Sequence, residues 1–437
     1  GLMTWLQRYH IRYYIQNSIV VLPVLGIAAA IIIAWLLTRI EARLGWQAAF
    51  SAGSIQTVIV TFAAAMLTFI VFLSSTLLVA VQLASGQLTP RIIGFVFRDP
   101  VTKWTLTTFS FTFTLSLAVL VRIGDTAPLL GSRLAVWSCV GSVCAFFYLI
   151  DHIGKALRPS GVLKEIGATG RTVIESVYPR RLVDLPETPR GSPAYLYEEP
   201  ALTIYSRGGG AVLAFQPEGL LLLAQRANCL IEMVPQVGDF VAIGDPLFRI
   251  YQNEKALSVD SVRQCVAVGQ ERTHEQDPAL AFRIIMDIAA KALSPAINDP
   301  TTAVLAIDQI HHLLRNVGSR HLDEGVMRDT DGRIRVVYRT PDWEDFVKLA
   351  TTEFRHFGGS SIQIIRRLRA MLENLIETLP PERTPALRQE LDLLRRTAER
   401  VFPDPEDWAL GADGDSQGLG GCGELRRSRK QVEDAPK

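Results

Sequence analysis

The fold is decided by residues 54–86, which read SIQTVIVTFAAAMLTFIVFLSSTLLVAVQLASG. No charged residue interrupts this stretch. A helix crosses the ~30 Å hydrocarbon core of a bilayer with about 20 mostly apolar residues, and this stretch wound as one helix is ~50 Å long. The sequence therefore predicts a membrane-spanning helix that tilts or projects into the cytoplasm.

Three further apolar stretches, each close to the length of one span, lie at residues 19–37, 104–121 and 134–150. Together with the first they predict a transmembrane domain of four helices in residues 1–155. The flanks on the side of the two termini carry more Lys and Arg than the flanks on the other side, and such residues stay in the cytoplasm. We therefore expect a multi-pass protein of the bacterial inner (plasma) membrane with cytoplasmic N- and C-termini.

Polar residues recur every seven positions along the long stretch, at Ser54, Thr61, Thr68, Ser75 and Gln82. A seven-residue repeat keeps one face of a helix along a left-handed packing seam. One interpretation is structural: hydroxyls in a membrane helix bond to neighbouring helices or to their own backbone. The other is that the repeat lines a water-filled pathway in an oligomer, which needs no charge within the membrane.

The apolar stretch at residues 104–121 alternates hydroxyl and apolar side chains over residues 108–117. Alternation is typical of a strand, but a lone strand cannot satisfy its backbone in lipid, so a helix is predicted. Thr108 and Thr112 then lie on one face with other hydroxyls on the opposite face. A helix of this kind is expected to lie among protein neighbours, which favours a bundle larger than one chain and makes these two residues further candidates for lining a pathway.

Two arginines, Arg91 and Arg98, lie in the connection between the second and third stretches. They are expected on the cytoplasmic side. Ordinary anchoring to lipid phosphates is one interpretation, and a ring of positive charge at the mouth of a pore is the other.

The rest of the chain divides by composition. A basic connector at residues 156–194 contains a proline-rich piece that marks a domain boundary. A small β-rich module is expected at 195–260, a mainly helical domain at 261–403, and a disordered glycine-rich tail at 404–437. The predicted fold class is thus a membrane α-helical part plus a cytoplasmic α+β domain, which contains a small β-barrel-like module and a helical part.

Residues 237–250 within the β-rich module have Gly-Asp pairs at 238–239 and 244–245. This segment resembles the hairpin of biotinyl and lipoyl barrel-sandwich modules. Those modules carry a modified lysine, and no lysine occupies the corresponding turn here. The resemblance therefore implies a small barrel used for packing or assembly, without carrier chemistry.

The densest polar sequence follows, around two predicted helices. Asp299 precedes a proline and fits a helix N-cap, with Ser294 and Asn298 holding the turn before it. Arg272 and Asp277 can pair with each other or with Asp287. The candidate cluster, either a structural polar core or a site for a small ligand or ion, consists of Arg272, Thr273, Gln276, Asp277, Asp287, Ser294, Asn298 and Asp299.

Composition disfavours several classes of function. The chain has 45 basic and 44 acidic residues, which argues against nucleic acid as a partner. Its five cysteines are scattered, so neither a disulfide framework nor a metal site is expected. Phosphate-loop, nucleophile-elbow and dinucleotide motifs are missing from the sequence. We therefore expect no cofactor and no catalysis.

Four motifs carry a family resemblance: residues 81–91, 237–241, 272–277 and 292–303. With four N-terminal spans before the soluble part, they resemble an uncharacterised bacterial membrane protein family, the Domain of Unknown Function numbered 2254. The resemblance extends to about residue 400. It implies the architecture and leaves the activity open.

The leading hypothesis is a homo-oligomeric, channel-like protein with a hydroxyl-lined pathway that the cytoplasmic domain gates or assembles. The alternative is a non-conducting membrane scaffold or sensor whose cytoplasmic domain binds a partner or a small ligand. Expected partners are membrane lipids, further copies of the chain, and an ion or small ligand.

Overall fold

The computed structural model divides into two compact units. One is His10–Val162 and the other combines Gly1–Tyr9 with Leu163–Lys437. Helix α1, Trp5–Asn17, contributes its first turn to the second unit and its remainder to the first. The residues described are 4–44, 52–93, 98–124, 127–182, 199–252, 257–322 and 325–420.

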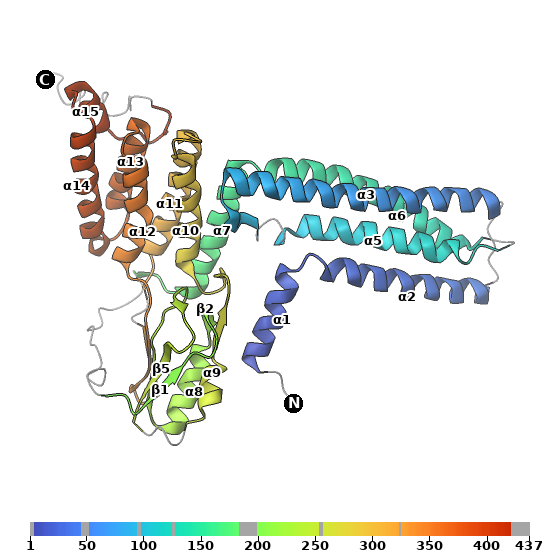
Figure 1. The fold of residues 1–437 in the computed structure, drawn as a ribbon, viewed down its shortest axis with the longest axis horizontal. Coiled ribbons are helices and arrows are strands. Elements are labelled where there is room, and N and C mark those ends of the chain that lie inside the picture. Colours follow the sequence, from blue (N-terminus) through green and yellow to red (C-terminus); the bar gives the residue numbers. More distant parts are fainter. Residues whose placement is uncertain are drawn as a thin grey trace, which may run out of the picture. The chain divides into compact units, whose positions relative to one another are not determined.

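Four long helices form the unit His10–Val162 and run along one another (Figure 1). They are α2 (Val21–Leu44), α3 (Ala52–Gln87), α5 (Pro100–Leu120) and α6 (Leu129–Ala156), with a short 3-10 helix η1 (Pro90–Ile92) after α3. Residues 54–86 lie in one continuous helix, α3, as predicted. Its 36 residues correspond to roughly 54 Å.

Helix α5 occupies the centre of this unit, because it packs against α2, α3 and α6. Along its length only Pro100, Trp104 and Leu117 are exposed. The three surrounding helices instead present large apolar side chains outward, among them Ile31, Phe72 and Phe147. The outer surface of the unit is therefore the apolar one, as expected where lipid replaces water.

Three helices are long and apolar enough to cross a membrane: Val21–Leu44, Ala52–Gly86 and Leu129–Ala156. The prediction of four spans is not confirmed, because α5 is not among them. The physical reason is its position. A helix enclosed by three others has no need of a lipid-facing apolar surface, so α5 carries hydroxyls where its neighbours carry aliphatic side chains.

Carboxylates fix the ends of two helices. Asp99 is the N-cap of α5, accepts from the backbone N–H of Thr102 at 2.8 Å, and lies 2.9 Å from Nε2 of His152. Glu41, near the end of α2, accepts from the backbone N–H groups of Leu130 and Gly131 in the first turn of α6. These contacts join neighbouring helices where their N–H groups would otherwise lack partners.

The other unit contains two sheets. The larger has the order β1-β5-β3-β8-β7, in which only β3 and β8 are parallel. The smaller has the order β4-β2-β6. Neither sheet closes on itself, so the expected barrel is wrong in the part of the chain that the structure describes. The strands are β1 (Leu202–Tyr205), β2 (Gly210–Phe215), β3 (Leu230–Met233), β4 (Phe240–Val241), β5 (Pro246–Tyr251), β6 (Val266–Gly269), β7 (Val326–Arg328) and β8 (Ile334–Tyr338).

The larger sheet has its own buried core, to which a strand from far along the chain contributes. Its buried side chains include Ile231, Phe248 and Val336. Strand β8, which contributes Val336, lies within the domain expected to be mainly helical, where the sequence predicts a hairpin after the Asp331-Gly332 turn. It pairs with β3, the central strand of the larger sheet. Helices α8 (Pro217–Ala227) and α9 (Val259–Arg263) complete this part.

Helices form the remainder of this unit (Figure 1). They are α7 (Pro159–Val177), α10 (Pro278–Ala292), α11 (Pro300–Gly318), α12 (Trp343–Phe357), α13 (Ile362–Thr378), α14 (Thr384–Val401) and α15 (Pro405–Gly411), with a 3-10 turn η5 (Pro381–Arg383). A disordered tail is expected from residue 404 onward, but the structure has helix α15 there and describes the chain to residue 420. Arg366 on α13 donates to the carbonyl of Asp413 at 3.1 Å, and Asp415 is buried. Residues 421–437 lie outside the described residues.

Candidate functional site

All five members of the polar repeat on α3 are exposed. The buried residues of the same helix, including Ile59, Met66 and Leu77, lie on its opposite side at 3.6 residues per turn. We call Ser54, Thr61, Thr68, Ser75 and Gln82 the α3 stripe. The stripe is thus not enclosed within one chain, and its outward face is available to lipid or to another subunit.

Hydroxyls of the α3 stripe are partly satisfied by their own helix. Thr61 Oγ1 donates to the carbonyl of Thr57 at 2.8 Å, and Thr68 Oγ1 donates to the carbonyl of Ala64 at 2.9 Å. Such bonds use the hydroxyl proton and leave the oxygen lone pairs facing outward. The exposed side of α3 therefore offers hydrogen-bond acceptors at these positions without any charge.

The hydroxyls of α5 behave differently. Thr112 is fully buried, and its Oγ1 lies 3.0 Å from Oγ of Ser142 and 3.3 Å from the carbonyl oxygen of Ser138, both on α6. Thr108 donates to the carbonyl of Trp104 at 2.9 Å. The neighbours that cover these hydroxyls belong to the same chain. The inference from α5 to a larger bundle therefore does not hold, and Thr112 does not reach an outer surface.

The two candidate arginines after α3 lie in different surroundings. Arg91 belongs to η1 and is exposed. Arg98 is partly buried and donates from Nε to the side-chain carbonyl of Asn17 at the end of α1. Arg98 thus has a partner within its own unit, whereas Arg91 is the one directed to the surface.

In the second unit, Arg272, Thr273, Gln276 and Asp277 lie together in the segment between β6 and α10. Asp277 is buried, caps α10 by accepting from Leu280 N–H at 3.1 Å, and pairs with Nη2 of Arg272 at 2.6 Å. Burial raises the pKa of Asp277, although the Arg272 guanidinium opposes the shift. The Asp277 carboxylate is therefore poorly solvated, while the Arg272 side chain that pairs with it reaches solvent.

Glycine at position 238 makes room for this ion pair. Its φ is +93°, and a Cβ there would stand 2.3 Å from Nη2 of Arg272 and 2.8 Å from Oδ2 of Asp277. Two of the motifs that carry the family resemblance, 237–241 and 272–277, are thus in direct contact. The contact explains their residue types: only glycine fits this turn beneath the ion pair.

The same segment contacts the start of α1. Tyr9 Oη lies 3.3 Å from Oγ1 of buried Thr273. Trp5 and Leu6 pack with Tyr9 against the small sheet, where Leu213 and Ala267 are buried. The first turn of the helix that precedes α2 is therefore part of the core of this unit.

The rest of the predicted cluster lies elsewhere. Ser294, Asn298 and Asp299 follow α10, whose 15 residues separate them from Asp277 by roughly 22 Å. Asp299 caps α11 as predicted, accepting from Thr302 N–H at 3.0 Å, and Ser294 and Asn298 hold the preceding turn through a 2.8 Å backbone bond. Asp287 pairs with Arg283 at 2.6 Å rather than with Arg272. The sequence suggests one polar cluster, but these residues lie in three places. They form one turn before α10, another turn before α11, and an ion pair on the face of α10.

We expect Asp277→Ala to lower the free energy of unfolding by about 3 kcal/mol, since it removes a helix cap and leaves Arg272 without its partner. Asp299→Ala is a matched control, because Asp299 caps α11 before a proline in the same way. The control should cost only about 1 kcal/mol. Thermal melts of the detergent-solubilised chain measure both, and equal losses would show that the ion pair adds nothing.

An open cavity of about 530 Å³ lies beside this segment. It is formed where the chain leaves α7, α11 and β8 and where α8 and α10 begin. Two contacts join the segments that follow α7, α11 and β8. Tyr178 Oη lies 3.0 Å from Thr340 Oγ1, and His321 N–H donates to the carbonyl of Arg180 at 3.0 Å. Within the described residues, His, Cys, Asp and Glu side chains form no group of three placed to hold a metal ion.

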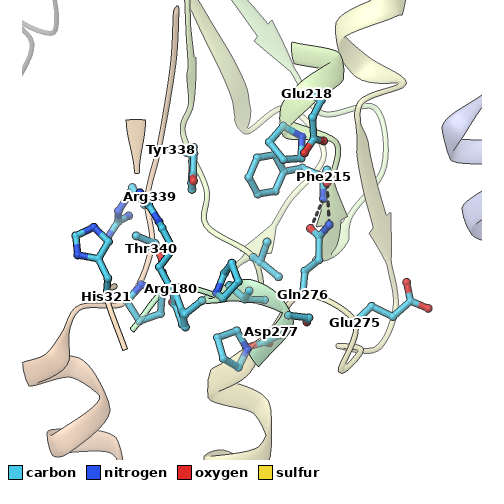
Figure 2. A pocket seen from close by; sticks show the side chains of 18 residues that line it. Arg180, Phe215, Glu218, Glu275, Gln276, Asp277, His321, Tyr338, Arg339 and Thr340 are labelled. Atoms are coloured by element: carbon cyan, nitrogen blue, oxygen red, sulfur yellow. Dashed lines mark hydrogen bonds between the residues drawn. The ribbon is translucent and has the colours of Figure 1, made fainter. Parts of the chain in front are cut away.

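One wall of the cavity is cationic. Figure 2 shows His321 and Arg339 on one side with Arg180 and Thr340 near them, and Phe215 and Glu218 across the cavity. Gln276 lies between the walls, and its side-chain amide forms both hydrogen bonds with the backbone of Phe215, at 2.9 and 3.0 Å.

The comparison with known proteins agrees with this architecture. The model of a family described as predicted membrane protein (DUF2254) matches residues 16–374. The chain belongs to the DUF2254 family. The family description names a membrane protein and no activity. Membership therefore supports the membrane architecture and does not indicate a particular reaction.

Relatives of this DUF2254 chain are found in mycobacteria. It is 25% identical over 420 residues to uncharacterized protein Mb1321c of Mycobacterium bovis and, equally, to uncharacterized protein Rv1290c of Mycobacterium tuberculosis. Each alignment covers 91% of this chain and 79% of the relative. No solved structure matches the chain significantly.

Three residues of the cavity wall in this DUF2254 protein escaped the sequence analysis. Arg180, His321 and Arg339 are far apart in sequence and belong to no motif. Each lies just beyond the end of a helix or strand, and only the fold brings these ends together. The signal in the sequence is only a basic residue one to three positions beyond the end of each element, and such residues are common at chain surfaces.

Proposed function

We propose that this DUF2254 protein is a homo-oligomeric, channel-like protein whose pathway is lined by the α3 stripe. The observation that carries the proposal is the exposure of all five stripe residues on the side of α3 away from its own bundle. A helix facing only lipid gains nothing from a continuous polar line, whereas a helix facing a water-filled axis does.

In this proposal α5 counts as a fourth span, shielded from lipid by the other three helices. Both termini and the soluble unit lie in the cytoplasm of a bacterial cell, in accordance with the distribution of Lys and Arg. Arg91, exposed after α3, stands at the cytoplasmic mouth or against lipid phosphates. The soluble unit assembles or gates the pathway and performs no catalysis.

The test uses two single variants that each introduce leucine, one at a stripe residue and one at its neighbour in the sequence. Ser75→Leu puts an aliphatic group on the stripe, while Ser74→Leu changes an adjacent exposed residue that lies off it. In planar bilayers the wild-type protein should conduct, Ser75→Leu should reduce the conductance at least tenfold, and Ser74→Leu should leave it nearly unchanged.

Two results would contradict the channel. One is that the purified wild-type protein conducts no ions in bilayers. The other is that mass measurement in lipid nanodiscs shows a monomer. A conducting protein on which both leucine substitutions act alike would remove the α3 stripe from the pathway.

A second candidate is a non-conducting sensor or scaffold, and the open cavity of the soluble unit favours it. In this function the spans anchor the chain, and binding in the cavity is the primary event. Absence of ion flux together with ligand binding would favour this candidate over the channel.

A further inference from the structure

Two arginines and a histidine line one wall of the cavity, and only the arginines carry a fixed charge. Among the described residues, the side chains of Arg180, His321 and Arg339 have neither a hydrogen-bond partner nor an ion-pair partner. Most other arginines of this unit are paired, for example Arg283 with Asp287 and Glu353. Cationic groups gathered at one wall repel one another, and a bound anion removes that repulsion.

The acidic residues of the cavity do not neutralise this wall. Asp277 is paired with Arg272 and caps α10. Glu218 lies across the cavity, and Figure 2 shows the side chain of Glu275 directed away from the arginines. The cavity is therefore polarised, with positive charge on one side only.

The remaining wall is suited to an uncharged organic group. The rings of Phe215 and Tyr338 are tilted to each other with their centroids 5.1 Å apart, and Val237 and Pro341 also line the cavity. A volume of about 530 Å³ lies within the range typical of small-molecule sites. Glu218 on this side disfavours a second anionic group in the ligand.

We infer that the cavity binds a phosphate monoester, with its phosphate against Arg180, His321 and Arg339 and its organic part against Phe215 and Tyr338. Guanidinium groups form paired hydrogen bonds with phosphate oxygens, which makes two arginines a specific receptor for such a group. Binding does not depend on conduction, so a failure of the proposed channel and a failure of this site are separate outcomes.

The experiment uses isothermal titration calorimetry on the full chain in detergent. Two phosphate monoesters, adenosine monophosphate and glycerol 3-phosphate, are each compared with the same molecule lacking phosphate. At least one ester should bind saturably and at least tenfold more tightly than its dephosphorylated partner. If neither ester does so, the inference is wrong.

Variants locate the binding. Arg180→Ala and Arg339→Ala should each weaken the ester at least tenfold, while Arg226→Ala should leave it unchanged. Arg226 is an exposed arginine at the far end of α8, outside the cavity lining. The two cavity arginines are exposed as well, so their replacement should leave the melting temperature nearly constant. Equal affinity in all three variants would overturn the assignment of the site.

Discussion

Gly238→Ala is expected to lower the free energy of unfolding of the soluble unit by roughly 4 kcal/mol. A φ of +93° already costs an alanine about 1–2 kcal/mol. The added Cβ would also overlap with the Arg272–Asp277 pair, and leaving the buried Asp277 carboxylate without its partner costs about 1–3 kcal/mol, since Arg272 itself is exposed to solvent. A thermal melt of the purified chain, followed by tryptophan fluorescence, measures the loss.

The hairpin provides its own control. Gly244 occupies the second Gly-Asp turn with a φ of +90°, but a Cβ there meets nothing within 4 Å. Gly244→Ala should therefore cost only the backbone strain, about 1–2 kcal/mol. A Gly238→Ala loss as small as that of Gly244→Ala would mean that the ion pair moves aside freely and does not define the turn.

Gly26→Leu is expected to destroy the packing of α2 on α5. A Cβ at Gly26 would stand 2.8 Å from Cγ2 and 3.1 Å from the carbonyl oxygen of Thr107, so even the first added atom meets the backbone of α5. Small residues let membrane helices approach this closely. The Thr107 methyl group can turn aside, but its carbonyl oxygen belongs to the α5 backbone and cannot, so we expect a loss of more than about 3 kcal/mol.

The matched control for this change is Gly141→Leu. Gly141 is on α6, where an added Cβ meets nothing within 4 Å. Gel filtration of detergent extracts should show a sharp peak for wild type and Gly141→Leu, and aggregated or degraded protein for Gly26→Leu. A sharp peak for Gly26→Leu would show that the α2–α5 contact is dispensable.

The sequence predicted the helical unit because lipid imposes a simple rule on residue type. The run 54–86 had to be one helix, and it is. The alternation around Thr112 was correctly assigned to a helix, but the identity of the neighbours was not accessible from composition. Hydroxyls on two faces indicate burial, and whether the same chain or another one covers them depends on the tertiary fold.

The soluble unit was harder to predict for a related reason. Asp299 before a proline is a local signal, and the cap was found. Arg272 and Asp277 were correctly considered as a pair, yet the role of Gly238 depends on a contact between segments 34 residues or more apart. Strand β8 joins the larger sheet beside its central strand β3, and no local pattern distinguishes an interior strand from one in a separate hairpin.

The enclosed position of α5 has a consequence for how the protein is made. The membrane insertion machinery selects segments by their apolar surface, and α5 offers Thr112 and Ser116 where the other three helices offer aliphatic groups. Helices α2 and α3 leave the ribosome first, so they are present to receive α5. The partner hydroxyl of Ser142 arrives later, on α6. Truncation before α6 should therefore leave α5 poorly inserted and rapidly degraded.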